Sequence, residues 1–382
     1  MRRRVVVLTE IIAPYRIPVF NALAKHADVD LHVIFLAEND PTQRQWLVYK
    51  NEIRFRYQVL PSWRRRLGRH SLLLNSGMET ALRRAAPEAI LCGGYNYIVS
   101  WQALRWAKRN GVPFSLWVES NARDFRSGLA WIESLKSRFL GDCSGVVVPG
   151  KSAFEYVMSY GVAEEIISVA PNAVDTDFFA EGAEVARGNA DACRQSLNLP
   201  ARFFLFVGRL VPEKGVFDLV EAYGRLTPDL RREIGLVLVG DGQARAGLEQ
   251  QAAAIRPGVI RVVGFAQREQ LPAYYGLADI FVFPTHSDPW GLVVNEAMAC
   301  GLPVICTDAA GCAADLVEDH WNGLVISPGD LNQLSSALNQ LARDHNLRLR
   351  CGQRSRERIL QYSPESCAEG LASAVLLRSV AA

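Results

Sequence analysis

The sequence predicts an α/β protein of two doubly wound domains in series, each built around a parallel sheet. Three observations support this prediction. The chain has 382 residues, which is long for a single hydrophobic core. Short β-branched runs alternate with helical patterns along its whole length, as they do in βαβ units. Hydrophobic residues make up 49% of the chain and charged residues 21%, which provides enough apolar material for two cores.

Short apolar runs mark the predicted strands. In the first half they cover residues 4–8, 30–35, 89–91, 113–118 and 145–148, with helical patterns at 17–25 and 100–110. In the second half they cover residues 203–207, 236–239, 260–263, 280–283, 303–306 and 323–325. Doubly wound sheets bind ligands at the carboxyl ends of their strands, so two such domains facing each other would form a site in the cleft between them.

The boundary between the two domains is predicted near residues 171–175, Pro-Asn-Ala-Val-Asp. Residues 180–192, which follow it, are polar, rich in alanine and without a strand pattern. The last segment, 363–380, begins Ser-Pro-Glu-Ser, a good helix start with proline at the first position. We therefore expect a final helix there.

The net charge of +2 hides an asymmetry between the two halves. Residues 1–172 hold 23 Lys and Arg against 15 Asp and Glu, so the remainder carries 19 against 25. Part of the basic excess is the run WRRRLGR at 63–69, which three leucines follow at 72–74. This run is either a solvated helix face or loop, or a patch for phosphorylated or membrane-bound acceptors.

The eight cysteines are scattered and form no CxxC pair, and no histidines stand at metal-ligand spacing. This pattern predicts the reduced, mostly buried thiols of a cytosolic protein, without structural zinc. The start MRRRVVVL imitates a signal peptide, but its four apolar residues are fewer than the roughly 7 to 15 of an h-region. No stretch approaches about 18 uninterrupted apolar residues, so no membrane span is expected.

The stretch GVVVPGKS at 145–152 matches the phosphate-binding loop pattern of ATPases and GTPases. In such a loop the four middle residues wrap the phosphates with their N–H groups. Here three of those residues are valines, which favour a buried strand, and the fourth is a proline, which lacks the N–H. We therefore predict a strand, a Pro-Gly turn and a helix that begins near Ser152. Lys151 and Ser152 would then lie at the carboxyl end of a first-domain strand.

The segment 283–305 is the richest in groups that could do chemistry. Its loop ends at Gly291, and the apolar spacing of 292–299 predicts a helix. Free N–H groups and the dipole at the start of that helix favour an anion such as phosphate. Asp288 in the loop and Glu296 in the helix could both contact a polyhydroxyl ligand. The alternative is that Asp288 caps the loop and Glu296 forms a surface ion pair.

A second motif, FVGRLVPEKG at 206–215, follows another predicted strand. It sets Arg209 and Lys214 on one βα loop, and these are the fork-shaped and point-charge donors that a diphosphate needs. Alone, such a loop could equally be solvated. Together with the acidic motif it indicates a site for a phosphorylated, hydroxyl-rich ligand.

These two motifs resemble those of the retaining glycosyltransferases of family 4. The matching frames are S-x-P-W-G-L-x-x-x-E-A-M-A-x-G-x-P-V-I and V-G-R-L-x-x-E-K-G. The glycine-rich turn 238–242, the nucleobase loop 263–265 and the interdomain motif 171–175 are similar as well. The resemblance implies the GT-B fold, in which two Rossmann-like domains face a cleft and the C-terminal helix crosses back to the first domain. It implies an acceptor domain of 1–172 plus 364–382 and a donor domain of 173–363.

The resemblance also implies a function and roles for single residues. A sugar would pass from a nucleotide-diphosphate sugar to a hydroxyl-bearing glycan or lipid-linked acceptor. Glu296 would accept hydrogen bonds from the ribose hydroxyls, while Arg209 and Lys214 would neutralise the diphosphate. With the helix N-terminus, these cations would make a metal unnecessary. Retention by same-face attack, with the leaving phosphate as base, would require no protein nucleophile, and no cofactor is expected. Asp288 would contact the sugar, and the other implied donor contacts are Gly208, Gly240, Gly264, Phe265, Pro289, Trp290, Gly291 and Leu292.

The chain departs from the family pattern at three places. The first acidic position, usually Glu, is Asp288, which is one methylene shorter. The loop after the first strand lacks the usual Gly-Gly pair and carries Tyr15 and Arg16, which either bind acceptor or diphosphate or pack the start of a helix. A histidine usual after a later strand is replaced in the segment 117–121.

In that segment, Glu119 and Asn121 could contact sugar hydroxyls, or Glu119 could pair with Arg123. Asn96, after a Gly-Gly-Tyr sequence, either lines the acceptor side or forms a tight turn.

Two other functions remain open at the level of sequence. One is a nucleotide-sugar-binding partner without catalysis, and the other is a GT-B epimerase of nucleotide sugars. No nucleic-acid partner is expected. The basic first domain favours an anionic or lipid-linked acceptor, and leaves open a peripheral association with the inner face of an anionic membrane.

Overall fold

The structure is a computed structural model that describes residues 2–40, 45–67, 70–123 and 130–376. The chain divides into two compact units. Unit 1 holds Met1–Ala122, Arg126–Ala173 and Pro364–Ala382, and unit 2 holds Arg123–Phe125 and Val174–Ser363. Two parts of the sequence predictions lie outside the described residues, namely positions 68–69 of the basic run and the end of the last helix after 376.

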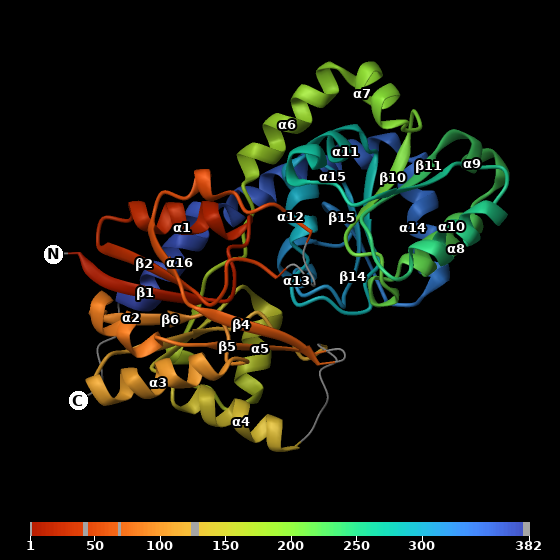
Figure 1. Cartoon of the computed structure of the whole chain (residues 1–382). Coiled ribbons are helices and arrows are strands. Elements are labelled where there is room, and N and C mark those ends of the chain that lie inside the picture. Colours follow the sequence, from red (N-terminus) through yellow and green to blue (C-terminus); the bar gives the residue numbers. More distant parts are fainter. Residues whose placement is uncertain (1, 41–44, 68–69, 124–129, 377–382) are drawn as a thin grey trace. The chain divides into compact units, whose positions relative to one another are not determined.

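Unit 1 is built on a seven-stranded sheet in which every neighbouring pair of strands is parallel (Figure 1). Its order is β3 (Arg56–Val59), β2 (Val29–Phe35), β1 (Arg3–Thr9), β6 (Ala89–Cys92), β7 (Phe114–Trp117), β8 (Gly145–Val148) and β9 (Ile167–Val169). Its helices are α1 (Arg16–Lys25), α2 (Met78–Ala85), α3 (Ile98–Asn110), α4 (Ala130–Gly141), α5 (Lys151–Ser159) and α16 (Pro364–Leu376), with short 3₁₀ turns at Lys50–Glu52 and Glu164–Ile166.

Both faces of this sheet are buried, which is why its strands are continuous apolar runs. Val6 and Leu8 of β1 face one core, which α2, α3, α4 and α5 cover. Val5 and Val7 face the other core, which α1 and α16 cover. The last helix therefore packs on the first unit although the chain of unit 2 precedes it, as the resemblance implied.

The described part of the basic run, residues 63–67, corrects a prediction, because it forms neither a helix face nor a loop. It lies in β4 (Ser62–Leu67), which pairs antiparallel with β5 (His70–Asn75). In this register Trp63 pairs with Leu74. Since side chains alternate along a strand, Leu73 is buried in the core while Trp63, Leu72 and Leu74 are exposed.

Unit 2 is built on a six-stranded parallel sheet. Its order is β12 (Ile260–Gly264), β11 (Gly235–Val239), β10 (Phe203–Val207), β13 (Ile280–Phe283), β14 (Val304–Thr307) and β15 (Gly323–Ile326). Its helices are α6 (Thr176–Gly188), α7 (Ala190–Leu197), α8 (Val216–Gly224), α9 (Pro228–Glu233), α10 (Arg245–Ala254), α11 (Leu271–Leu277), α12 (Leu292–Ala299), α13 (Ala313–Leu316), α14 (Leu331–Arg343) and α15 (His345–Ile359). Short 3₁₀ turns lie at Pro212–Lys214, Arg268–Gln270 and Leu360–Tyr362.

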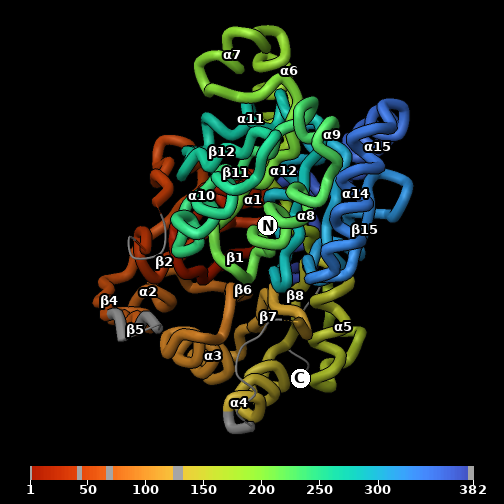
Figure 2. Tube along the Cα trace, turned by 90° about the vertical axis from the view of Figure 1, so that its right-hand side faces the viewer, coloured from red at the N-terminus to blue at the C-terminus, as the bar shows by residue number. Residues whose placement is uncertain are grey.

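The alanine-rich segment 180–192 lies in α6 and α7, of which α6 packs against α11 (Figure 1). On another flank of the unit, α14 and α15 lie side by side (Figure 2).

The predicted parallel strands are confirmed to within one residue at each end. In particular, GVVVPGKS forms the buried strand β8 followed by α5, which begins at Lys151, so its valines do not form a phosphate-binding loop. Across the described ranges, the structure contains no helix with the length and apolar character needed to cross a bilayer.

Candidate functional site

The candidate donor site is formed where three neighbouring strands of unit 2, β11, β10 and β13, end at the carboxyl edge of the sheet. The loops after β10 and β11 approach each other closely. A Cβ at Gly240 would lie 1.8 Å from the carbonyl oxygen of Gly208, and one at Gly242 would lie 2.3 Å from that of Leu210. Both glycines have positive φ, so only glycine fits here. This contact fixes the path of the loop that carries Arg209.

Lys214 and Asp288 form an ion pair in this site. The Lys214 ammonium donates to Asp288 Oδ2 (2.5 Å) and to the carbonyl of Ser287 (3.0 Å), and its side chain is only 11% exposed. Asp288 Oδ1 accepts the backbone N–H of Trp290 (3.0 Å). The sequence predicted both residues for the site but not that they pair. In this structure Asp288 therefore orients the lysine and shapes its own loop.

Arg209 differs from Lys214 in that its side chain is exposed. Its guanidinium forms no ion pair or hydrogen bond with any residue that the structure describes. Its guanidinium is therefore available to an anionic ligand.

The N-terminus of α12 provides further donors. Gly291, with φ 98°, precedes the helix, and no side chain caps its first N–H groups. The side chain of Trp290 is 4% exposed and its Nε1 donates to Asn295 Oδ1 (2.9 Å). Trp290, a predicted donor contact, thus has its ring in the core, and its backbone, with that of Pro289 and Leu292, is the part at the loop.

Glu296 lies in α12 and accepts a hydrogen bond from the hydroxyl of Tyr275 (2.6 Å to Oε2). It forms no ion pair within the described ranges, contrary to the surface-pair alternative. Burial raises the pKa of Glu296 to about 7, and the hydrogen bond from Tyr275 partly offsets this shift. Sequence reasoning missed Tyr275, because one tyrosine in a short apolar helix has no feature that distinguishes it from core.

The predicted nucleobase loop lies at the end of β12. Gly264 has φ 95°, and its carbonyl accepts the N–H of Gly240 (2.8 Å), which joins this loop to the glycine-rich turn. The ring of Phe265 is 41% exposed. The structure thus brings Gly208, Gly240 and Gly264 to one edge of the sheet.

In unit 1, a hollow of about 130 Å³ lies at the carboxyl ends of β1, β6 and β7. It brings together three of the predicted acceptor residues, Tyr15, Arg16 and Glu119. The Arg16 guanidinium forms an ion pair with Glu119 and stacks on Trp117, 3.7 Å from the ring centroid. Its side chain is 12% exposed. The other lining residues are Thr9, Glu10, Ile11, Ala13, Trp46 and Gly93.

The two predicted asparagines do not line this hollow. Asn96 is exposed in the bend after β6, and Asn121 is buried. Arg123, considered above as a partner of Glu119, forms an ion pair with Asp308 within unit 2 (2.6 Å).

The described residues contain no group of three or more His, Cys, Asp or Glu side chains that could hold a metal ion. All eight cysteines are free thiols, and all but Cys193 are buried.

Two family models match the chain. The model of the glycosyl transferases group 1 matches residues 191–358, and that of glycosyltransferase family 4 matches residues 19–178. Over 167 residues the chain is 31% identical to the O-antigen chain mannosyltransferase B of Escherichia coli. The matched region covers 43% of each chain. Over 226 residues it is 30% identical to the D-inositol 3-phosphate glycosyltransferase of Corynebacterium jeikeium. This matched region covers 57% of this chain and 53% of that one. The chain thus spans about half the length of these curated relatives.

Among solved structures, HepE from Anabaena in complex with UDP and glucose has a TM-score of 0.75 to this chain at 18% identity. The match covers 98% of this chain and 100% of that one. At this identity the likeness shows the fold, and it confirms two Rossmann-like units of the GT-B type.

Proposed function

Because this chain belongs to the group 1 glycosyltransferases of the family 4 type, we propose that it moves a sugar from a nucleotide-diphosphate sugar to a hydroxyl acceptor. The observation that carries this proposal is the carboxyl edge of the second sheet. There the exposed Arg209, the Lys214–Asp288 pair and the uncapped start of α12 come from the adjacent strands β10 and β13. Together they provide the cations and N–H donors that a diphosphate requires.

The donor is held by groups with separate tasks. The Arg209 guanidinium and the first N–H groups of α12 bind the phosphates directly, since no side chain among the described residues forms a hydrogen bond or ion pair with them. Lys214 adds a second positive charge that Asp288 holds in place until the phosphates arrive. Glu296, ionised, accepts hydrogen bonds from the ribose hydroxyls, and Gly264 with Phe265 flanks the base.

The transfer proceeds with retention and without a metal ion. Arg209, Lys214 and the helix N-terminus stabilise the charge that develops on the leaving diphosphate, which is the task of a divalent cation in other phosphate chemistry. The acceptor hydroxyl attacks from the face that the diphosphate leaves, and a phosphate oxygen takes its proton. This same-face attack requires no carboxylate nucleophile, and Asp288 is paired with Lys214 in this structure.

The acceptor lies against the hollow of unit 1. The aromatic side chains of this hollow and the Arg16–Glu119 pair suit a sugar ring with several hydroxyl groups. The apolar face of the sugar can stack on an aromatic ring, while its hydroxyl groups exchange hydrogen bonds with the ion pair. Relatives named for O-antigen and teichuronic acid synthesis support a glycan or lipid-linked acceptor, and HepE with UDP supports a uridine donor.

The exposed face of the β4–β5 pair supports the proposal that the protein binds peripherally to an anionic membrane. Its register sets Trp63, Arg65, Leu72 and Leu74 on one face, all of them exposed. Aromatic, basic and leucine side chains on one face are the composition of an interfacial element. Trp63→Ser with Leu74→Ser should reduce co-sedimentation with vesicles of phosphatidylserine and phosphatidylcholine several-fold. Equal sedimentation of the variant and the parent protein would exclude this role.

The function is tested by incubation of the full chain with labelled UDP- and GDP-sugars and a panel of glycan and polyprenyl-linked acceptors, with and without EDTA. Transfer that persists in EDTA, with retained anomeric configuration, is the expected result. Isomerised donor without transfer would identify an epimerase, and saturable binding without turnover would identify a binding partner.

A further inference from the structure

A second charged hollow lies in unit 2, away from the candidate donor site. Arg202, Asp279 and Pro303 of its lining stand directly before β10, β13 and β14, so it opens at the amino edge of the sheet. Parallel strands put the donor loops at the other edge. The remaining walls come from α6, α7, α11 and α15. Its volume of about 860 Å³ falls within the range of about 300 to 1,000 Å³ that is typical of small-molecule sites.

Positive charge dominates the lining of this hollow. It contains five arginines against two carboxylates, and each carboxylate is shared by two arginines. Glu184 pairs with Arg187 and Arg356, and Asp279 pairs with Arg202 and Arg348. The fifth arginine, Arg194, has its only ion pair among the described residues with Asp191, a fully exposed carboxylate that does not line the hollow.

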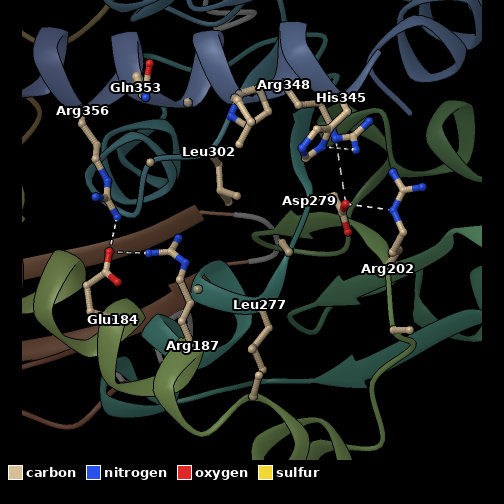
Figure 3. A pocket seen from close by; sticks show the side chains of 18 of the residues that line it. Glu184, Arg187, Arg202, Leu277, Asp279, Leu302, His345, Arg348, Gln353 and Arg356 are labelled. Atoms are coloured by element: carbon tan, nitrogen blue, oxygen red, sulfur yellow. Dashed lines mark hydrogen bonds and ion pairs between the residues drawn. The ribbon is translucent and has the colours of Figure 1, made fainter. Parts of the chain in front are cut away.

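The two arginine–carboxylate clusters stand at opposite ends of the hollow (Figure 3). Glu184, Arg187 and Arg356 lie at one end, between α6 and α15. Asp279 and its arginines lie at the other. Leu277 and Leu302 lie between the clusters. A ligand that fits this arrangement has two anionic ends and a middle that tolerates apolar surface.

Structural roles account for some of these arginines and not for others. Arg187 donates to the carbonyl of Cys300 (2.5 Å), and Arg202 and Arg348 donate to the carbonyl of Ala342 near the end of α14 (3.1 and 2.8 Å). These three guanidinium groups help to cap helices. Burial and, to a smaller extent, the neighbouring Arg202 lower the pKa of Arg348, while Asp279 and Asp344 partly offset this shift.

Arg194 and Arg356 lack such a role. The Nε of Arg194 is buried without an acceptor among the described residues, and its nearest carboxylate, Asp191, is fully exposed and 3.9 Å from Nη1. A buried donor without an acceptor is costly and uncommon. Arg356 bonds to Glu184, which Arg187 already neutralises.

We propose that this hollow is a second anion-binding site, for a small molecule that carries two or more phosphate groups and contacts both clusters. Guanidinium forks match phosphate oxygens in pairs, and two clusters at separate ends select a ligand with more than one phosphate. The site is independent of the sugar transfer proposed above, and it takes a ligand whether or not the chain is a transferase.

The probe is inorganic triphosphate, titrated into the full chain by calorimetry, with orthophosphate as the single-phosphate comparison. Arg194→Gln and Arg356→Gln should each weaken triphosphate binding about tenfold or more. Arg350→Gln is the matched control, because Arg350 is also exposed on α15 but does not line the hollow, and it should change the affinity less than about twofold. Orthophosphate should bind at least about tenfold more weakly than triphosphate.

Triphosphate could also bind at the donor site, so the titration is repeated with Arg209→Gln. Binding that survives Arg209→Gln and is lost in the two hollow variants supports the proposal. It is overturned if triphosphate does not bind, if Arg209→Gln alone removes binding, or if Arg350→Gln weakens it as much as the hollow variants do. If orthophosphate binds as tightly as triphosphate, the proposal that the ligand contacts both clusters is overturned. Thermal unfolding without ligand checks each fold, and Arg194→Gln carries the test if Arg356→Gln is unstable.

Discussion

The two units differ in the loops that follow their central strands. In unit 2, glycines let the loops after β10 and β11 touch, and the exposed Arg209 guanidinium has no partner among the residues that the structure describes. In unit 1, the loop after β1 carries Tyr15 and Arg16 where the family has glycines, and Arg16 is enclosed by Glu119 and Trp117. The same doubly wound architecture therefore gives one open cationic edge and one filled edge whose charge is neutralised internally.

This difference matches the ligands that we propose. A diphosphate needs positive charge, and the exposed Arg209 guanidinium provides it without an ion pair to any residue that the structure describes. A hydroxyl acceptor needs polar groups in fixed positions, and the ion pair of unit 1 provides them without net charge. Because Glu119 neutralises Arg16, we expect Arg16 not to bind an anion.

The largest effect is expected from Lys214→Ala. It removes a phosphate contact and also leaves the Asp288 carboxylate without its cation, so kcat/KM for the donor should fall about 100-fold. Arg209→Ala removes one contact and leaves no charge behind, so about tenfold is expected. Steady-state kinetics with varied donor measures both. A larger loss for Arg209→Ala than for Lys214→Ala would contradict the view that Asp288 depends on the lysine.

Glu296→Ala should lower donor kcat/KM at least about tenfold, since hydrogen bonds to a charged group are worth about 1.5 to 3 kcal/mol. Tyr275→Phe is the matched control, because it removes a neighbour of the carboxylate and keeps the carboxylate itself. At pH values well above the pKa of Glu296, it should cost only about twofold. An unchanged kcat/KM in Glu296→Ala would remove this residue from the site.

Much of this arrangement could be predicted from the sequence, because its signals are local. Buried parallel strands are short apolar runs bounded by polar residues, so their positions were found without knowledge of their partners. The loop motifs then placed Arg209, Asp288 and Glu296 near strand ends, where the α/β architecture puts its ligands.

The parts that escaped prediction depend on distant pairing. Whether Lys214 is free or held by Asp288 depends on two loops 74 residues apart in sequence. Tyr275 contacts Glu296 from another helix. The hairpin at 62–75 was missed because its charged run hides the period-two alternation that exposes Trp63.

The pH dependence of the open edge follows from the raised pKa of Glu296. A protonated carboxyl group accepts hydrogen bonds poorly, so donor kcat/KM should rise with pH through an apparent pKa near 7 and fall about tenfold per unit below it. Because the Tyr275 hydrogen bond lowers this pKa, Tyr275→Phe should move the limb to higher pH. If the pH profile does not shift in Tyr275→Phe, or if it keeps the same pKa in Glu296→Gln, the titration belongs to another group.

Stability should respond to the same group with the opposite sign. The folded protein holds the Glu296 proton more tightly than the unfolded chain, so this group favours folding less as pH rises from about 4.5 to about 7. Glu296→Gln should be about 1 to 3 kcal/mol more stable than the parent at pH 8 and nearly equal to it at pH 4. Denaturant titrations at the two pH values measure the difference. Equal stability of the variant and the parent at pH 8 would mean that the folded protein does not raise the pKa of this carboxyl group.

The smallest effect is expected at the filled edge. Arg16→Ala should raise the KM for the acceptor about three- to tenfold and leave the donor KM within about twofold, because Arg16 faces the hollow of unit 1. Glu119→Gln tests the same pair, and the double variant should cost less than the sum of the two single changes. Arg16→Lys should restore little, since a lysine cannot stack on Trp117 as a planar guanidinium does. A raised donor KM with an unchanged acceptor KM would instead make Arg16 a phosphate ligand and erase the contrast between the two edges.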